Sequence, residues 1–246
     1  MARATFSIWR GDAAGGELRD YATEVTEGMV VLDAVHQIQA ESANDLAVRW
    51  NCKAGKCGSC SAEVNGNPRL MCMTRLSDLP LDRPVTIEPM RAFPPLRDLV
   101  TDVSWNFAAK RRIKKFKPRP PDAPDGTWRM DQEDVERVQE FRKCIECFLC
   151  QDVCHVLREH HLHEQFIGPR LLVYAATLEM HPLDVERRTR DLREQGIGFC
   201  NITKCCTKVC PEGITITNNA IIPLKERVVD DVFDPLAKLL RVLRRE

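Results

Sequence analysis

Four cysteines between positions 144 and 154 have a spacing that is typical of iron-sulfur ligands. They lie in the run Cys144-Ile-Glu-Cys147-Phe-Leu-Cys150-Gln-Asp-Val-Cys154, which is C-x2-C-x2-C-x3-C. This spacing bends a short backbone so that three thiolates reach one cubane cluster while the fourth points elsewhere. The run therefore predicts electron-transfer chemistry, and it needs a partner run to complete its site.

A second and incomplete copy of the run lies downstream. Positions 200, 203, 206 and 210 repeat the spacing and end in Cys210-Pro211, with Thr203 in place of the second cysteine. In two-cluster ferredoxins the fourth cysteine of each run ligates the cluster of the other run. We therefore expect a [4Fe-4S] cluster with four thiolates and a [3Fe-4S] cluster with three. The expected ligands are Cys144, Cys147, Cys150 and Cys210 for the first, and Cys154, Cys200 and Cys206 for the second.

A third cysteine set lies nearer the N-terminus. Cys52, Cys57 and Cys60 have the spacing C-x4-C-x2-C, and Cys72 follows at a distance. This is the plant-type [2Fe-2S] pattern. Gly55 and Gly58 leave backbone N-H groups free to approach the sulfides without a Cβ atom in the way, so we expect these four cysteines to bind a [2Fe-2S] cluster.

Other uses of the cysteines fit the sequence less well. Zinc sites use C-x2-C pairs, but three cysteines at intervals of three followed by a fourth and a proline are not a usual zinc spacing. Disulfides are typical of secreted chains, and no secretory signal follows Met1. Cys205, next to Cys206, is expected to be a small buried residue that points away from the cluster, with a fourth-ligand role as the alternative.

Composition limits the class of protein. The chain has 246 residues, enough for two domains, and 36 basic residues balance 36 acidic ones, so nucleic acid is not an expected partner. No stretch is apolar and long enough to span a membrane. The run Lys110–Arg119 is strongly basic and passes into prolines, so we expect either a solvated linker or a contact with an acidic partner or anionic lipid.

The elements that must position the first cysteine set form a β-grasp pattern. Residues 2–10 and 19–26 read as a hairpin, and a helix follows from Val31 to near Asn44. Asn65-Gly66 predicts a hairpin turn that returns Cys72 to the cluster, and Val85 to Glu88 can close the sheet. Leu96 to Phe107 is expected to be helical.

The C-terminal half is expected to be helical, with the clusters in its loops. Asp131 is a candidate N-cap for one helix, and Ile167-Gly168-Pro169 opens another. Asp184 to Gln195 is expected to be an exposed, charged helix that stops at Gly196. Two amphipathic helices, about Thr217 to Val229 and Pro235 to Arg245, are expected to finish the chain.

The sequence therefore predicts an α+β protein. An N-terminal β-grasp plant-type ferredoxin domain is expected at 1–106, a basic and proline-rich linker at 107–125, and an all-α bacterial-type two-cluster ferredoxin domain at 126–246. Histidines 155, 160, 161 and 163 crowd the connection after Cys154. They could relay protons, or they could line a polar loop.

This arrangement resembles the iron-sulfur subunit of succinate dehydrogenase and fumarate reductase. The resemblance rests on the order of the domains, the eleven ligand positions, the Phe166-Ile-Gly-Pro169 segment and the Cys210-Pro211 ending. It implies electron transfer from FAD on a flavoprotein subunit through [2Fe-2S], [4Fe-4S] and [3Fe-4S] to quinone at a membrane anchor subunit. It also implies that no catalytic residue for succinate lies on this chain, which would be peripheral on the cytoplasmic face of the bacterial cell membrane.

The chain departs from the ubiquinone-using members of that family. Those members usually have Pro-Ser-x-Trp-Trp directly after the cysteine that corresponds to Cys154, whereas here the residues are His155-Val-Leu-Arg-Glu-His160. A version that is rich in histidine and lacks tryptophan resembles the enzymes of menaquinone-using bacteria. The resemblance thus implies menaquinone, with His155 and Thr203 close to it.

Two other functions stay open at this point. An electron-transfer subunit of another flavin dehydrogenase, such as one delivering to a disulfide reductase or a glycolate oxidase, would usually add CCG segments, which this chain lacks. A free-standing soluble carrier would not need a second domain with partly apolar outer faces. The physiological direction of the reaction depends on cluster and quinone potentials, which hydrogen bonds and burial set.

Overall fold

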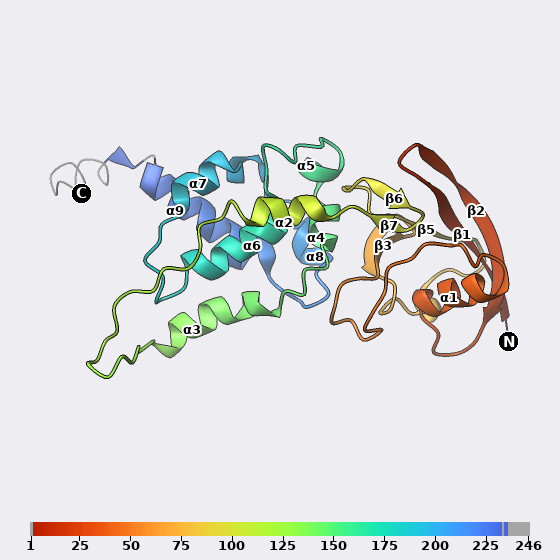
Figure 1. The fold of residues 1–246 in the computed structure, drawn as a ribbon, viewed down its shortest axis with the longest axis horizontal. Helices are drawn as coiled ribbons and strands as arrows, with labels where there is room; N and C mark the ends of the chain where they lie inside the picture. Colours follow the sequence, from red (N-terminus) through yellow and green to blue (C-terminus); the bar gives the residue numbers. More distant parts are fainter. Residues whose placement is uncertain (1, 233, 236–246) are drawn as a thin grey trace. The chain divides into compact units, whose positions relative to one another are not determined.

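The computed structural model describes residues 2–232 and 234–235 and is an α+β structure (Figure 1). The described residues form two compact units, one within Met1–Val103, Ile145–Glu159 and Val209–Pro211, and the other within Ser104–Cys144, His160–Lys208 and Glu212–Glu246. This grouping differs from the division expected around the linker, because two pieces of the C-terminal half belong to the first unit. The physical reason is packing: Cys147 and Leu149 are part of the same buried cluster as Phe6 and Ile8.

The first unit is built on a mixed sheet. Strand β1 (Ala2–Asp12) pairs antiparallel with β2 (Gly15–Val25), which confirms the expected hairpin, and parallel with β5 (Val85–Glu88). Strands β3 (Ser61–Val64) and β4 (Asn67–Leu70) form the hairpin expected around Asn65-Gly66, and β3 also pairs with β5. The parallel pair β1–β5 between two antiparallel hairpins is the β-grasp arrangement.

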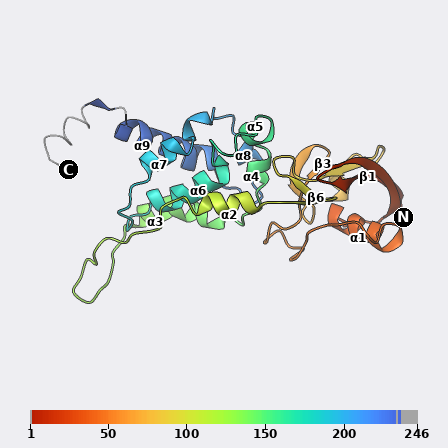
Figure 2. The same ribbon diagram turned by 45° about the horizontal axis from the view of Figure 1, so that its top comes forward.

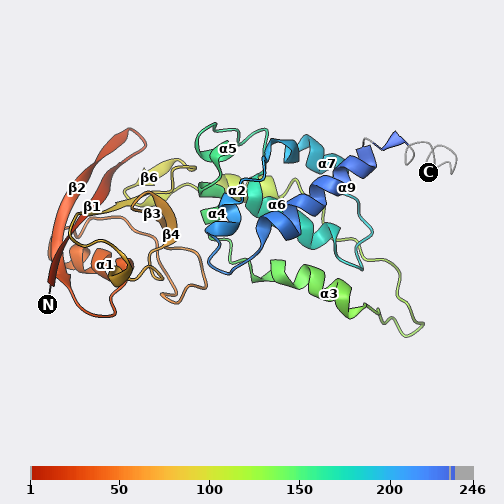
Figure 3. The same ribbon diagram turned by 180° about the vertical axis from the view of Figure 1, so that it is seen from behind.

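Helix α1 (Val31–Glu41) packs beside β2, as Figures 1 and 3 show. It begins where the Asp33 carboxylate accepts a hydrogen bond from the Val30 N-H at 3.1 Å, which satisfies one of the free amides at the helix start. Its buried face consists of Val31, Leu32, Ala34, Val35 and Ile38. The helical spacing seen in the sequence therefore marks the core face.

The helix expected from Leu96 to Phe107 is wrong over its first half. Strands β6 (Pro95–Arg97) and β7 (Val100–Thr101) form a hairpin there, and helix α2 (Ser104–Lys110) begins only afterwards. Asp98 has a left-handed backbone with φ +47°, which turns the chain between the strands. Leu96 is 53% exposed and Leu99 only 4%, so the helical spacing of leucines was coincidental.

The hairpin has a structural role that helps to place the first cysteine loop. The buried Asp98 carboxylate accepts hydrogen bonds from the Gly11 N-H at 3.1 Å and the Ala47 N-H at 2.8 Å, and it pairs with Arg10 at 3.0 Å. The Leu99 N-H also donates to the Ala47 carbonyl at 3.2 Å. These bonds attach residue 47, shortly before Cys52, to the sheet.

The second unit is helical. Helix α6 (Gly168–Glu179) contacts α2 and α3 (Gln132–Gln139), and α7 (Thr189–Glu194) lies beside α9 (Ile222–Val232), which Figure 2 also shows. Shorter elements complete it: η2 (Glu140–Lys143), η3 (Ile197–Phe199), α8 (Cys205–Lys208) and the π-helical turn η4 (Ile216–Ile221). Of the helices within 2–232, none has the length and hydropathy that a bilayer-spanning segment needs.

The helix starts expected here are partly confirmed. Pro169 lies in the first turn of α6, where its missing N-H costs nothing. Asp131 occupies the N-cap position of α3 but makes no side-chain capping bond. The helix expected from Pro235 to Arg245 lies outside the described residues except for Pro235.

The stretch Asp184 to Gln195 was expected to be one helix exposed on most faces, but only Thr189–Glu194 is helical and parts of the stretch are buried. The Arg188 and Asp184 side chains are 1% and 0% exposed and pair at 2.8 Å. Arg188 also donates to the carbonyl oxygens of Lys114 at 2.9 Å and Lys115 at 2.8 Å. The basic run is therefore fixed against this stretch by a buried guanidinium, and it is not simply a solvated linker.

We predict that Arg188→Ala lowers the free energy of unfolding by about 3–5 kcal/mol, because it leaves the buried Asp184 carboxylate without its cation. Hydrogen exchange of the backbone amides of 110–119 should also become faster. Arg190→Ala removes an exposed arginine two residues further along the chain and is the control. Equal exchange in the two variants would contradict the role given to Arg188.

Candidate iron-sulfur sites

The loop between α1 and β3 presents three of the four cysteines of the first set. Lys53, Gly55 and Gly58 have left-handed backbones, with φ of +52°, +68° and +70°. As a result the N-H groups of Ala54 and Lys56 turn inward and donate to the Cys52 sulfur at 3.4 and 3.3 Å. Successive inward N-H groups form a concave anion site of the kind that Fe-S clusters use.

The four thiols of this set converge. Cys52 hydrogen-bonds to Cys57, and Cys72 to Cys60, while Cys57 and Cys60 interact electrostatically. Burial raises the pKa of Cys60 to about 12. Burial would also raise the pKa of Cys57, but hydrogen bonds from Ser59 and Cys52 outweigh it and lower the pKa to about 7. Cluster binding requires all four as thiolates, and the soft sulfur set suits iron.

The two downstream runs have the same backbone conformation at equivalent positions. Glu146 and Phe148 have φ of +54° and +61°, and Ile202 and Lys204 have φ of +63° and +61°. A helical turn follows in each case, α4 (Leu149–Asp152) in the first run and α8 in the second. The internal repeat read from cysteine spacing is thus also a structural repeat, and it persists although Thr203 replaces a cysteine.

Left-handed conformations cost energy for residues with a side chain, and they persist where the surroundings require them. Alternating them curls the chain so that successive amides and side chains face a common centre. The donor set and this curl suit a cubane cluster in both runs. Among the described residues, no group of three or more Cys, His, Asp or Glu is arranged as a site for a single metal ion.

All twelve cysteines are free thiols. Six of them are buried: Cys60, Cys72, Cys147, Cys150, Cys154 and Cys206. The first unit contains the complete plant-type set, whereas the other expected ligands belong to both units: Cys147, Cys150, Cys154 and Cys210 to the first, and Cys144, Cys200 and Cys206 to the second. The sharing of these seven residues between two clusters stays a prediction.

The vacant ligand position is close to the extra cysteine. The Thr203 hydroxyl donates to the Cys205 sulfur at 3.4 Å, and Cys205 is half-buried rather than buried as expected. The neighbouring Cys206 sulfur lies 3.5 Å from the hydroxyl of Thr217, which is 1% exposed. The Thr207 hydroxyl donates to Thr217 at 3.0 Å, so the Thr217 proton is left to point at the sulfur.

A buried charge cluster that was not predicted from the sequence holds the first downstream run within the first unit. Glu63 on β3 pairs with Arg158 on α5 (His155–Arg158) at 3.0 Å and with Arg91 at 3.1 Å. Asp152 on α4 accepts the Ala92 N-H at 3.0 Å. Burial raises the pKa of Glu63, against the effect of the two arginines, and raises the pKa of Asp152 to about 7.

The histidines after Cys154 are divided between the two compact units. His155 begins α5 in the first unit, and His160, His161 and His163 belong to the second. The His163 ring lies edge-on to Trp105 at 4.8 Å, and its carbonyl accepts the Trp105 indole N-H at 3.1 Å. His163 therefore has a packing role, while a proton-relay role for His155 stays a prediction.

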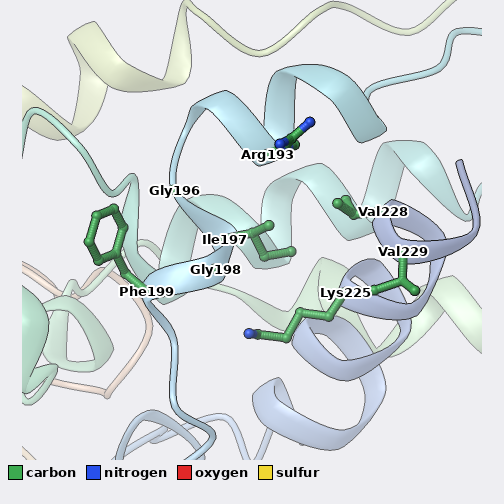
Figure 4. Close-up of a pocket in the computed structure, with 8 residues that line it drawn as sticks. All are labelled: Arg193, Gly196, Ile197, Gly198, Phe199, Lys225, Val228 and Val229. Atoms are coloured by element: carbon green, nitrogen blue, oxygen red, sulfur yellow. The ribbon is translucent and has the colours of Figure 1, made fainter. Parts of the chain in front are cut away.

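A pocket of about 530 Å³ lies in the second unit, and part of its lining comes from residues 196–199, which directly precede Cys200 in the sequence (Figure 4). Its walls are mainly apolar, and two cations, Arg193 of α7 and Lys225 of α9, line it as well. Figure 4 shows Lys225 extending from α9 towards the turn that carries Phe199. The apolar lining includes Ile197, Phe199, Val228 and Val229, of which Phe199 and Val229 are about half exposed.

Comparison with protein families agrees with this description. A family model for a 2Fe-2S iron-sulfur cluster binding domain matches residues 5–108, and a 4Fe-4S dicluster domain model matches residues 140–214. The first match includes all four plant-type cysteines. The second includes both downstream runs.

Relatives and solved structures are similar over most of the chain. The structure titled Mycobacterium smegmatis Sdh1 complex in the apo form has a chain with a TM-score of 0.91 and 60% identity, covering 95% of this chain and 98% of that one. A fumarate reductase iron-sulfur subunit of Mycobacterium tuberculosis is 33% identical over 79% of both chains. A succinate dehydrogenase iron-sulfur subunit of Bacillus subtilis is 29% identical over 87% and 88%. Three archaeal relatives are longer, and the chain spans 39% to 42% of their length.

We predict that Thr217→Val lowers the midpoint potential of the cluster expected at Cys206, because a hydroxyl donated to sulfur stabilises the more negative reduced state. Removing this buried hydrogen bond should also cost about 1 kcal/mol of stability. A redox titration of the purified complex measures the shift. Thr177→Val, which removes a hydroxyl bonded to the Val173 carbonyl instead of a cysteine, is the control. A Thr217→Val potential equal to that of the control would contradict the assignment.

Proposed function

This chain belongs to the family of iron-sulfur subunits of succinate dehydrogenases and fumarate reductases and is an electron-transfer subunit of such an oxidoreductase, and we propose the route that its electrons take. Electrons pass between FAD on a flavoprotein subunit and a quinone at membrane anchor subunits. On this chain they pass through [2Fe-2S], then [4Fe-4S], then [3Fe-4S]. The succinate or fumarate site lies on the flavoprotein, and no side chain of this chain is catalytic.

The observation that carries the proposal is the repeated backbone curl around the two downstream runs. It recurs at four positions that are not glycine and that have the same offsets from the cysteines in both runs, and such costly conformations persist where the surroundings require them. Together with the plant-type loop it supports three cluster sites on one chain. We assign [2Fe-2S] to Cys52, Cys57, Cys60 and Cys72, [4Fe-4S] to Cys144, Cys147, Cys150 and Cys210, and [3Fe-4S] to Cys154, Cys200 and Cys206. With this assignment, the [2Fe-2S] domain is residues 1–106, the domain with the other two clusters is residues 126–246, and residues 107–125 join them.

The three-iron cluster is proposed because one thiolate is missing. The repeat puts Thr203 where the second run needs a cysteine, and a neutral hydroxyl binds iron poorly beside thiolates. We propose that Cys205, whose sulfur accepts a hydrogen bond from the Thr203 hydroxyl, is not a ligand. Three thiolates give a less negative site than four, which favours a higher potential and suits the last centre before quinone.

The quinone end is proposed at the side of the second unit that contains Cys200. The adjacent pocket, with apolar walls and two cations, supports an apolar and partly anionic partner at this side. We propose membrane anchor subunits as that partner, menaquinone as the quinone, and His155 and Thr203 as residues near it. The chain is then peripheral on the cytoplasmic face of the bacterial membrane, attached through proteins.

Either direction of turnover is compatible with this route. One relative is named a fumarate reductase subunit and another a succinate dehydrogenase subunit, so reduction of fumarate is the second candidate. The length of the archaeal relatives keeps a subunit of another flavin dehydrogenase as a further alternative. Co-purification with a flavoprotein and a membrane subunit separates these from a free carrier.

We predict that Cys57→Ala abolishes the reduced [2Fe-2S] EPR signal, because the remaining three thiolates cannot complete the two-iron site. The signals of the other two clusters should remain. Cys205→Ala is the matched control and should leave the [2Fe-2S] signal intact. A Cys57→Ala complex that kept this signal would show that the first loop does not bind the cluster.

We also predict about nine irons per chain and an EPR-active [3Fe-4S] cluster in the oxidised complex, from clusters of two, four and three irons. Cys205→Ser should change neither. The contrary result is a wild type with about ten irons and no oxidised [3Fe-4S] signal, together with a Cys205→Ser variant in which that signal is present. Cys205 would then be a fourth ligand and the cluster a [4Fe-4S].

A further inference from the structure

The loop of the plant-type set touches the first downstream run inside the first unit. A Cβ atom built on Gly58, between Cys57 and Cys60, would lie 2.5 Å from the Cys147 Cα and 2.8 Å from its Cβ. Carbon atoms do not approach so closely without a shift of the backbone. Gly58 also has a φ of +70°, so glycine is required here for both space and conformation.

A buried hydroxyl bridges the same two segments. Ser61, which directly follows Cys60, has its Oγ at 2.8 Å from the Gly58 carbonyl oxygen and 2.8 Å from the Cys147 carbonyl oxygen. It is 6% exposed, so water does not easily replace it. Since a hydroxyl has one proton, it serves the two carbonyls in turn or by a bifurcated bond.

Contacts around this point keep Cys147 in place. The Phe148 ring packs edge-on against Phe93 with ring centroids 6.2 Å apart. The Asp152–Ala92 hydrogen bond and the Arg158–Glu63 ion pair hold α4 and α5 to the same unit. The contact is therefore one fixed point of a packed interface and is not an isolated touch between two loops.

We propose that Gly58 and Ser61 are positioning residues that set the separation between the [2Fe-2S] and [4Fe-4S] ligand sets and the electronic coupling across it. This inference rests on the cluster assignment made above. Cys60 and Cys147 are assigned as ligands of different clusters, and covalent bonds plus the Ser61 hydrogen bond connect them. One electron moves from the reduced first cluster to the oxidised second cluster along this connection, and no bond is made or broken.

The proposal predicts a different effect for a substitution at each of the two residues. Gly58→Ala has to push Cys147 away, and so it increases the separation. Ser61→Ala keeps the backbone but removes the bridge and leaves two buried carbonyl oxygens without this donor. Ser61→Thr keeps the hydroxyl and should behave as the wild type.

The test uses the purified complex with all clusters reduced. The power saturation of the [2Fe-2S] EPR signal reports how strongly the neighbouring reduced cluster relaxes it, which falls with distance. Pulse radiolysis reports the rate at which an injected electron redistributes between the two clusters. Gly66→Ala is a matched control, because Gly66 also has a φ of +70° but its added Cβ would meet nothing within 4 Å. Ser42→Ala, which removes another hydroxyl bonded to a backbone carbonyl, controls for Ser61.

We expect full iron content in every variant, with easier saturation in Gly58→Ala and slower redistribution in both Gly58→Ala and Ser61→Ala. The controls and Ser61→Thr should match the wild type in both measurements. Unchanged saturation and redistribution in Gly58→Ala and Ser61→Ala would overturn the proposal. If Gly58→Ala does not assemble, the comparison of Ser61→Ala with Ser61→Thr decides. Absence of either cluster signal in the wild type would overturn the cluster assignment itself. This failure is distinguished from failure of the present proposal because it is seen in the wild type, without any variant.

Discussion

The geometry of this protein depends on one requirement, that several thiolates face a single point. A chain in ordinary helical or extended conformation cannot meet it, because its side chains diverge. Left-handed residues reverse the local curl, and they occur in each cysteine loop, as Lys53, Gly55 and Gly58 in the first and as Glu146, Phe148, Ile202 and Lys204 in the other two. The energy that these residues cost has to be recovered from ligation and from the packing around the loops.

That packing explains why the compact units do not follow the order of the chain. Cys147 and Leu149 contribute to the core beneath the β-grasp sheet, so the first downstream run folds with the N-terminal residues. The buried Glu63 and Asp152 side chains would be unfavourable alone, and two arginines and a backbone amide compensate them in part. The other oxygen of each carboxylate, Glu63 Oε1 and Asp152 Oδ2, is buried without a hydrogen-bond partner. A cluster-binding segment is thus positioned by charges and aromatic contacts as well as by its own cysteines.

The sequence predicted the parts of this structure that depend on local spacing. The Asn65-Gly66 turn and the helical periodicity around Val31 correspond to local backbone geometry, and the β3–β4 hairpin and α1 confirm them. The cysteine intervals also correspond to a repeated local backbone geometry, while the ligand assignment read from them stays a prediction. The β6–β7 hairpin was missed because Leu96 and Leu99 imitate a helical face while Asp98 turns the chain. The buried Arg188 was missed because charge alone suggests exposure, and only tertiary contacts with the Lys114 and Lys115 carbonyls explain it. The roles of Ser61 and Thr217 could not be predicted from the sequence, because a hydroxyl alone does not indicate its partner. The partner of Ser61, the Cys147 carbonyl, lies far along the chain, and the contact between Thr217 and the Cys206 sulfur is recognised only from the distance between them.

The repeat with one missing thiolate connects structure to function. The second run keeps the backbone conformation of the first, while Thr203 offers only a hydroxyl, so the difference that we propose between the two downstream clusters lies in one side chain. Mössbauer spectroscopy of the oxidised complex enriched in ⁵⁷Fe tests this most directly, because it separates iron by cluster type. The account predicts [2Fe-2S], [4Fe-4S] and [3Fe-4S] iron in a ratio of about 2:4:3. Iron in only [2Fe-2S] and [4Fe-4S] environments, at about 2:8, would contradict it.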